Sequence, residues 1–316
     1  QIVGIDIEAL GARSRAVLWQ DGVMLDLNLA VDPLALGDWL RELQVTHVAM
    51  ESTGVYWKPV WHILAGSFTL LLVNAQHIKH VPGRKTDVKD SQWIAQLLQY
   101  GLLRSSFVPE EPQQQWRDLT RLRTQLVAGT SRTANRIQKV LEDANIKLAS
   151  VASDSLGVSG REMIRGMIAG IQSPQVLASC AKGRLKSKSQ ALEEALLGRV
   201  TEHHRFVLRL LMDELEQTEK LIERLEQRIE EAMRPFAQEL ELLDGIPGVD
   251  RRLAQVILAE VGVDMSRFPT PAHLCSWAAM CPGNHESAGK RKSGKTCKAN
   301  RWLRTALVQA GWAASH

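Results

Sequence analysis

Cysteine is scarce in this chain of 316 residues. There are four cysteines, and no two of them have the C-x-x-C spacing of a zinc site. They are Cys180, Cys275, Cys281 and Cys297. This usage argues against a disulfide framework and predicts the reduced thiols of a cytoplasmic protein. The sequence also lacks an apolar run of about 18 residues and a signal peptide, so it predicts neither a membrane span nor secretion.

The excess of positive over negative residues is also small. The formal net charge is +4, so an argument for nucleic acid depends on where the cations lie rather than on their total. Residues 285–304 contain seven Lys or Arg and one acid. The length and the 45% of hydrophobic residues are those of a globular protein with two or three domains.

Strands and helices alternate in the predicted structure of residues 1–105. Alternating or continuous apolar residues predict five strands, and helical spacing predicts three helices. The order is three strands, helix, strand, helix, strand, helix, which is that of an RNase H-like α/β fold. The predicted strands are 1–7, 14–22, 23–31, 46–52 and 68–75, and the predicted helices are 32–43, 58–66 and 87–103.

The rest of the chain is predicted to be mostly helical. A basic helix between Arg117 and Lys139 is a candidate contact for RNA or DNA. Residues 208–229 place apolar side chains at spacings of 3 and 4 for about three heptads. Such a seam predicts a long helix packed on its own domain, or pairing with a second helix from the same chain or from a partner subunit. The seam residues are Leu208, Leu211, Leu215, Thr218, Ile222, Leu225 and Ile229.

Residues 242–262 predict a helix, a Gly-Ile-Pro-Gly hairpin and a second helix. Backbone N–H groups in such a hairpin grip phosphates without reading bases, which makes Gly245 and Gly248 candidate nucleic-acid contacts. A plain turn between helices is the alternative. The basic stretch that follows predicts further phosphate contacts, with a solvated face as its alternative. Its candidates are Lys290, Arg291, Lys292, Lys295, Lys298 and Arg301.

Four carboxylates fall where an RNase H-like domain would bring them together. Asp6 follows the apolar part of the first strand, Glu51 ends the fourth, and Asp87 and Asp90 stand one helical turn apart. Gathered anions repel unless a cation neutralises them, and hard oxygen ligands suit Mg²⁺ or Mn²⁺. Such a site activates an attacking oxygen at a phosphodiester. The alternatives are helix caps for the two aspartates, and Glu8 in place of Asp6.

Five motifs occur in order through nearly the whole chain: GIDIEA, ESTGVYWKPVWHIL, VNAQHIKHVPGRKTDVKDSQWIAQLLQYGLL, GIPGV and HESAGKRKSGKTCKANRWLRTAL. Together they resemble the one-ten class of insertion-sequence transposases, relatives of the Piv DNA invertases. The pair ESTG and KTDVKD is specific to this class, whereas GIPG alone is not. The resemblance implies a RuvC-like metal-dependent nuclease domain at 1–110, a helical coiled-coil region at 111–240 and a C-terminal transposase domain at 241–316.

The resemblance also implies roles for individual residues. The four acids match the family's Asp-Glu-Asp-Asp metal site, and Ser287 in HESAGKRKSG matches its catalytic serine. A serine of this kind cleaves a strand, forms a phosphoserine link and religates the DNA. Many members read Ser-Gly where this chain reads Ser287-Ala288, and Ser293 is the second candidate. His285 is either a base for the serine or a surface histidine.

In this family a non-coding bridge RNA pairs with target and donor DNA and supplies the sequence specificity. We therefore expect a bacterial, nucleoid-associated recombinase whose partners are donor DNA, target DNA, the bridge RNA and further copies of itself, as a dimer or a tetramer. The acids and the serine meet within one chain or between subunits. Two alternatives stay open: a metal-dependent nuclease or junction resolvase without a covalent intermediate, and a nucleic-acid-binding protein without catalysis.

Overall fold

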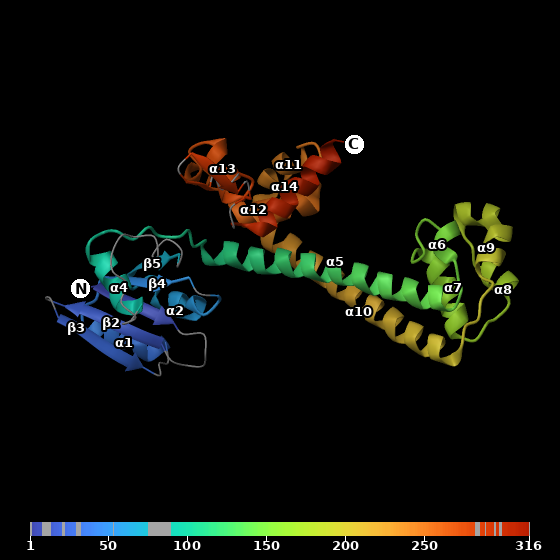
Figure 1. The fold of residues 1–316 in the computed structure, drawn as a ribbon, viewed down its shortest axis with the longest axis horizontal. Coiled ribbons are helices and arrows are strands. Elements are labelled where there is room, and N and C mark those ends of the chain that lie inside the picture. Colours follow the sequence, from blue (N-terminus) through green and yellow to red (C-terminus); the bar gives the residue numbers. More distant parts are fainter. Residues whose placement is uncertain are drawn as a thin grey trace. The chain divides into compact units, whose positions relative to one another are not determined.

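The structure, a computed structural model, describes most of the chain. The described residues are 2–7, 14–20, 23–29, 33–52, 54–74, 90–281, 285–287, 289–293, 295–296 and 299–315. They form two compact units, residues 1–109 and residues 110–316 (Figure 1). Within the described part of the chain, no helix has both the length and the apolar character needed to cross a membrane.

Unit 1 is built on a five-stranded sheet with the order β3-β2-β1-β4-β5. The first three strands form an antiparallel meander, and β1, β4 and β5 run parallel to one another. The central strand is therefore β1. The strands are β1 (Ile2–Ile7), β2 (Ser14–Gln20), β3 (Val23–Leu29), β4 (His47–Glu51) and β5 (Thr69–Val73).

Helices cover both faces of this sheet. The helices α1 (Pro33–Glu42) and α2 (Trp57–Leu64) share a core with Val3, Val48 and Met50. On the opposite face, α4 (Asp90–Gln99) buries Ile94 and Leu97 against Ala49 and Val73. Successive residues of β4 thus face opposite helices, as the period of two in a strand requires. The helix predicted from Asp87 is described from Asp90 onward.

Unit 2 is organised by two long helices, α5 (Glu111–Asp143) and α10 (Glu202–Met233), which lie side by side (Figure 1). They are antiparallel, because Thr133 contacts Glu214 and Asp143 contacts His204. The seam predicted at residues 208–229 belongs to α10, and most of its apolar side chains are buried. Of the predicted alternatives, the structure shows pairing with a second helix of the same chain.

Two groups of shorter helices pack at opposite ends of this pair (Figure 1). The distal cluster, residues 147–200, shares its core with the end of α5 and the start of α10. The C-terminal cluster, residues 234–315, packs on the other ends of both helices. The distal cluster contains α6 (Leu148–Val151), α7 (Val158–Ile168), α8 (Pro174–Ala178), the 3-10 helix η1 (Gly183–Lys188) and α9 (Ser189–Ala195). The C-terminal cluster contains η2 (Arg234–Phe236), α11 (Ala237–Asp244), α12 (Arg251–Val261), η3 (Met265–Arg267), α13 (Pro271–Trp277), β6 (His285–Ser287), β7 (Lys290–Ser293) and α14 (Arg301–Ala314).

Side-chain caps fix where several of these helices begin. At α10, the Thr201 hydroxyl accepts the N–H of His204, and the His204 ring accepts the N–H of Thr201, which forms a capping box. Asp250 caps α12 and Asn300 caps α14 in the same general way. The start of α14 is therefore defined by a polar residue directly before Arg301, the last residue of the basic stretch.

Candidate active site and nucleic-acid interface

The carboxyl ends of β1 and β4 lie side by side in unit 1. The parallel register pairs Ile5 with Met50, so Asp6 and Glu51 are the next two positions along these neighbouring strands. Glu51 is half-buried. The helix α4 packs on both strands and begins at Asp90. Three of the four predicted acids are thus carried by two adjacent strand ends and one helix start.

The side chain of Glu51 is described, whereas Asp6 and Asp90 are described by their backbone alone. Asp87, and the rival candidate Glu8, lie outside the described residues. Among the side chains that the structure does describe, no three His, Cys, Asp or Glu gather closely enough to hold a metal ion. The structure therefore places Asp6 and Glu51 at neighbouring strand ends, and it places Asp90 at the start of the helix that packs on both strands.

Ser287 lies at the turn of a small hairpin in the C-terminal cluster. It is the last residue of β6 and pairs with Lys290, the first residue of β7. Two residues separate them, and the second, Gly289, has a φ of +74°. Two-residue hairpin turns favour glycine because they need this left-handed conformation. The position predicted for the nucleophile is therefore at the tip of a tight turn, opposite a lysine.

The second candidate, Ser293, lies at the other end of the same hairpin, paired with His285. Its hydroxyl oxygen accepts the backbone N–H of Lys295 at 3.2 Å. A serine that closes a local turn in this way has a structural reason for its presence.

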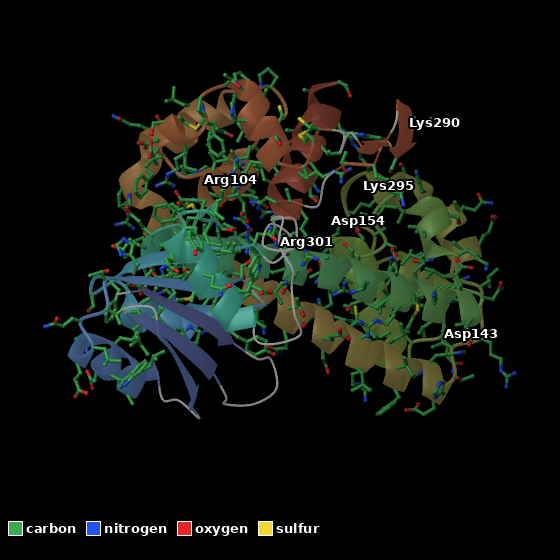
Figure 2. All side chains as sticks on the ribbon, turned by 60° about the vertical axis from the view of Figure 1, so that its left-hand side comes forward. Arg104, Asp143, Asp154, Lys290, Lys295 and Arg301 are labelled. Atoms are coloured by element: carbon green, nitrogen blue, oxygen red, sulfur yellow. The ribbon has the colours of Figure 1, made fainter. Side chains whose placement is uncertain are left out.

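The predicted nucleic-acid contacts of the basic stretch fall on the hairpin and on the start of α14. Lys290, Lys295 and Arg301 all have exposed side chains (Figure 2). The Arg301 guanidinium lies 4.8 Å from the centre of the Trp302 ring. Arg291 and Lys292 belong to β7 and are described by their backbone, and Lys298 lies outside the described residues.

The Gly-Ile-Pro-Gly segment joins α11 to α12 as predicted for a hairpin between helices. Its N–H groups are largely used inside the turn: Gly245 donates to Glu241 O at 3.0 Å, and Ile246 donates to Leu243 O at 3.1 Å. At the start of α12, the Asp250 carboxylate accepts the N–H of Leu253 at 2.8 Å. The helix start that follows the hairpin is therefore already occupied by an acidic cap.

Gly248 has a packing role that the sequence did not reveal. Its φ is +83°, and a Cβ atom at this position would lie 2.2 Å from the carbonyl oxygen of Ala310 in α14. Gly245 has a φ of −68°, and a Cβ atom there would meet no atom closer than 3.5 Å. The hairpin packs against α14 only because residue 248 lacks a side chain.

We expect Gly248→Ala to lower the free energy of unfolding by at least about 2 kcal/mol, since it adds a backbone clash to a left-handed residue. For a unit of this size the melting temperature should fall by at least roughly 4 to 8 °C. Gly245→Ala is the matched control and should change stability by less than about 0.5 kcal/mol. Differential scanning calorimetry of both variants measures this, and equal effects would contradict the packing role.

Glu260 organises the base of the C-terminal cluster. It is fully buried, and its carboxylate accepts two N–H groups of Arg121, at 2.7 and 2.8 Å. It also accepts the amide of Asn300, the cap of α14, at 2.7 Å. Arg117 lies 3.4 Å away, and burial lowers the pKa of Arg117 to about 10 although Glu260 acts in the opposite direction. This network holds α5, α12 and the end of the basic stretch in one arrangement.

A second network lies beside the first. Arg123 donates to the Gln255 side chain at 2.5 Å and to the Arg252 carbonyl at 2.9 Å. Gln255 in turn donates to Glu230 of α10 at 2.9 Å. The side-chain N–H groups of Arg117, Arg121 and Arg123 thus donate to acceptors within the protein. The expectation that the basic helix offers its cations to nucleic acid therefore does not hold for these three arginines.

The sequence signal for these networks is weak. Glu260 interrupts the apolar run of α12, and Arg117 and Arg121 are four residues apart on α5. Each pattern is also typical of a solvated helix face. Only the packing of α5 on α12 shows that they belong together.

Comparison with known proteins gives matches at both ends of the chain. Residues 14–146 match the family DEDD Tnp IS110, described as a transposase, and residues 240–316 match the family described as Transposase IS116/IS110/IS902. A protein of Pseudomonas aeruginosa with the name "Probable family 20 transposase" is 26% identical over 275 residues, which cover 86% of this chain and 72% of that protein. These similarities agree with the motifs found in the sequence.

Proposed function

The chain belongs to the IS116/IS110/IS902 family of transposases, and from this premise we propose that it cuts and rejoins DNA with a metal-binding acidic site and a serine nucleophile, guided by a bridge RNA. Membership of the family makes it a DNA-binding strand-transfer enzyme. The single observation that best supports the finer proposal is the adjacency of Asp6 and Glu51 at the ends of two parallel strands.

The topology of unit 1 supports an RNase H-like fold. The order of strands and helices along the chain is the one predicted from the sequence, and the sheet has β1 at its centre, with β2 antiparallel to it and β4 parallel. We propose that residues 1–110 form the nuclease domain, residues 111–240 a helical region with a coiled coil built from α5 and α10, and residues 241–316 the transposase domain that carries the serine.

Strand alternation supports a common site for the acids. On β4, Ala49 faces α4, so Glu51 shares that face two residues later. On β1, Val3 faces α1 and α2, which assigns position 6 to the α4 side as well. Because α4 itself begins at Asp90, all three positions belong to one side of the sheet.

The chemistry of this donor set fits a hard divalent cation. We propose that Asp6, Glu51, Asp87 and Asp90 hold Mg²⁺ or Mn²⁺ through carboxylate oxygens. When bound, the metal would neutralise the charge that develops on the reacting phosphate. The four carboxylates supply the ligands and fix the ion at the carboxyl end of the central strands.

The serine would perform the covalent step. In this proposal the Ser287 oxygen forms a bond to phosphorus while the bond to the leaving deoxyribose oxygen breaks, and the hydroxyl proton passes to that oxygen or to solvent. The phosphoserine diester keeps the energy of the broken linkage, so the reverse attack by a DNA hydroxyl rejoins strands without a cofactor. In this proposal Lys290, which pairs with Ser287 across the hairpin, would attract the phosphate.

The guide and the assembly complete the proposal. A bridge RNA would supply specificity by base pairing, with the protein contacting mainly backbone phosphates through the basic stretch that ends at Arg301. Further copies of the chain, as a dimer or tetramer, would let the acids and the serine act on one phosphate within or between subunits. The competing function is a metal-dependent nuclease that hydrolyses strands without a covalent link.

A plasmid carrying donor and target sites tests the proposal when it is incubated with purified protein and RNA transcribed from the non-coding end of the element. Strand cleavage should need both Mg²⁺ and the RNA, should stop with EDTA, and should return when Mn²⁺ is added. Cleavage that persists in EDTA would contradict the metal site. Cleavage without RNA would overturn the guide while leaving the metal chemistry in place.

A further inference from the structure

The distal cluster carries a dense run of positive charge. The segment KGRLKSK, residues 182–188 and here named the basic turn, contains four cations and includes η1. No acidic residue occurs between Glu162 and Glu193. The four cations all have exposed side chains, and they are Lys182, Arg184, Lys186 and Lys188.

The backbone of the basic turn is fixed by the protein. Leu185 packs against the core of the distal cluster. The N–H of Lys182 donates to the buried Ser159 hydroxyl at 2.9 Å, and the Ser187 hydroxyl donates to Arg184 O at 2.9 Å. The cations are therefore presented on a preorganised turn, so that binding a ligand requires little ordering of the backbone.

A hollow lies beside the turn. It has a volume of about 580 Å³, and Lys182, Arg184 and Lys188 line it together with Asp154 and the start of α7. The Asp154 carboxylate accepts the N–H of Leu156 at 3.0 Å. Of these three cations, Lys182 also pairs with Glu162, and Lys188 donates to the carbonyl of Val151 at 3.2 Å. Asp154, labelled in Figure 2, is already engaged in its local turn.

Several cations around the basic turn are balanced by acids, including Lys182 of the turn itself, which pairs with Glu162. Arg161 pairs with Glu219 and Arg165 pairs with Glu216, each at 2.5 Å. Among the residues that the structure describes, Arg184 and Lys186 have no carboxylate within ion-pair distance. Like charges gathered without counter-charges repel one another, and a polyanion would relieve that repulsion.

We propose that the basic turn binds the phosphodiester backbone of a nucleic acid, away from the site of strand cleavage. On α5, Arg121 contacts Glu260 at the base of the C-terminal cluster, and Leu141 lies in the core of the distal cluster. Twenty residues of helix separate them, which is about 30 Å, close to the roughly 34 Å of one turn of duplex. The two clusters are therefore attached to α5 about 30 Å apart along its axis.

This inference deepens the proposed function and relies on the DNA-binding character of the family, but it needs neither the metal site nor the serine. Its test measures binding alone. The double variant Arg184→Gln with Lys186→Gln removes two unpaired charges. A matched control, Arg209→Gln with Arg224→Gln, removes two exposed cations of α10 that have no ion pair among the described residues.

Binding of each full-length protein to a 40-base-pair duplex and to the element's RNA is measured by fluorescence anisotropy between about 50 and 300 mM salt. We expect the Arg184/Lys186 variant to bind at least one of the two nucleic acids roughly 10- to 50-fold more weakly at about 0.1 M salt. The slope of log K against log[salt] should become shallower by up to about two, since two phosphate contacts are lost. The control, and the charge-preserving swap Arg184→Lys with Lys186→Arg, should bind as the wild type does.

The nucleic acid whose affinity falls identifies the source of the phosphates, DNA or RNA. Equal affinities for the Arg184/Lys186 variant, the α10 control and the wild type would overturn the inference and leave the basic turn as a solvated face. A failure of strand cleavage in the plasmid experiment, by contrast, would leave this binding result unaffected.

Discussion

Glu51→Gln should reduce strand cleavage by about 10³-fold or more, because a transition state that loses about 4 kcal/mol of stabilisation reacts about a thousand times more slowly. The substitution keeps the size of the side chain at the end of β4 and removes its negative charge. If Glu51 shares a cation with Asp6, Asp87 and Asp90, replacing it with a neutral ligand weakens metal binding where the phosphate reacts. Rates of plasmid nicking at saturating Mg²⁺ give the measurement.

The matched control for this variant is Glu42→Gln. Glu42 is exposed at the end of α1, which packs on the opposite face of the same sheet. It undergoes the same chemical change in the same unit, and cleavage should stay within about twofold of the wild type, as for an ordinary surface substitution. Both variants should bind DNA normally. Cleavage by Glu51→Gln at a tenth of the wild-type rate or more would mean that Glu51 is not a metal ligand.

Ser287→Ala should abolish the covalent protein–DNA adduct. The substitution removes the hydroxyl at the tip of the hairpin and leaves the neighbouring cations in place, so binding of DNA should persist. Loss of a nucleophile lowers activity by several orders of magnitude in enzymes that form covalent intermediates. The adduct is detected as labelled DNA that stays with the protein in SDS, and mass spectrometry of the digested adduct locates the phosphoserine.

Ser293→Ala is the control for the serine assignment, since it makes the same change on the same hairpin. Ser293 accepts the N–H of Lys295, so its loss should lower stability by about 1 kcal/mol and leave the adduct intact. Loss of the adduct in Ser293→Ala alone would move the nucleophile to Ser293. Unchanged nicking by Ser287→Ala, with no adduct in the wild type, would favour the hydrolytic nuclease.

The sheet of unit 1 was predictable because its strands carry strong periodic signals. β1 alternates apolar residues, β4 and β5 are short apolar runs, and each ends close to the predicted position. Glu51 ends β4 and Asp6 is the last but one residue of β1, and the RNase H-like order of the elements is the reason that the two could be expected together. The family assignment was also predictable from the motifs, and the two family matches confirm it.

The long helices were only partly predictable. The seam of α10 fixes which face is buried, but a heptad pattern does not say which helix covers it. The structure shows that α5 of the same chain does so. The short helices of the distal cluster were not predicted, because four to eleven residues give too few turns for a clear period.

The buried charges were beyond sequence reasoning. Arg117, Arg121 and Arg123 look like a solvated basic face, since charged residues are rarely buried unless they are paired. Glu260, the partner of Arg117 and Arg121, lies about 140 residues further along the chain, and Gln255, the partner of Arg123, lies 132 residues further. Removing one member of such a network typically costs about 3–5 kcal/mol, so it acts as a fixed base for the segment that carries the serine.

Crystals of the full chain grown with Mn²⁺ test the central proposal most directly, because the anomalous signal locates the ion independently of the protein. The account predicts a peak at about 2.0–2.4 Å from carboxylate oxygens of both Asp6 and Glu51, completed by Asp87 or Asp90. Side chains of these acids that point apart, or a bound ion that touches none of them, would contradict it.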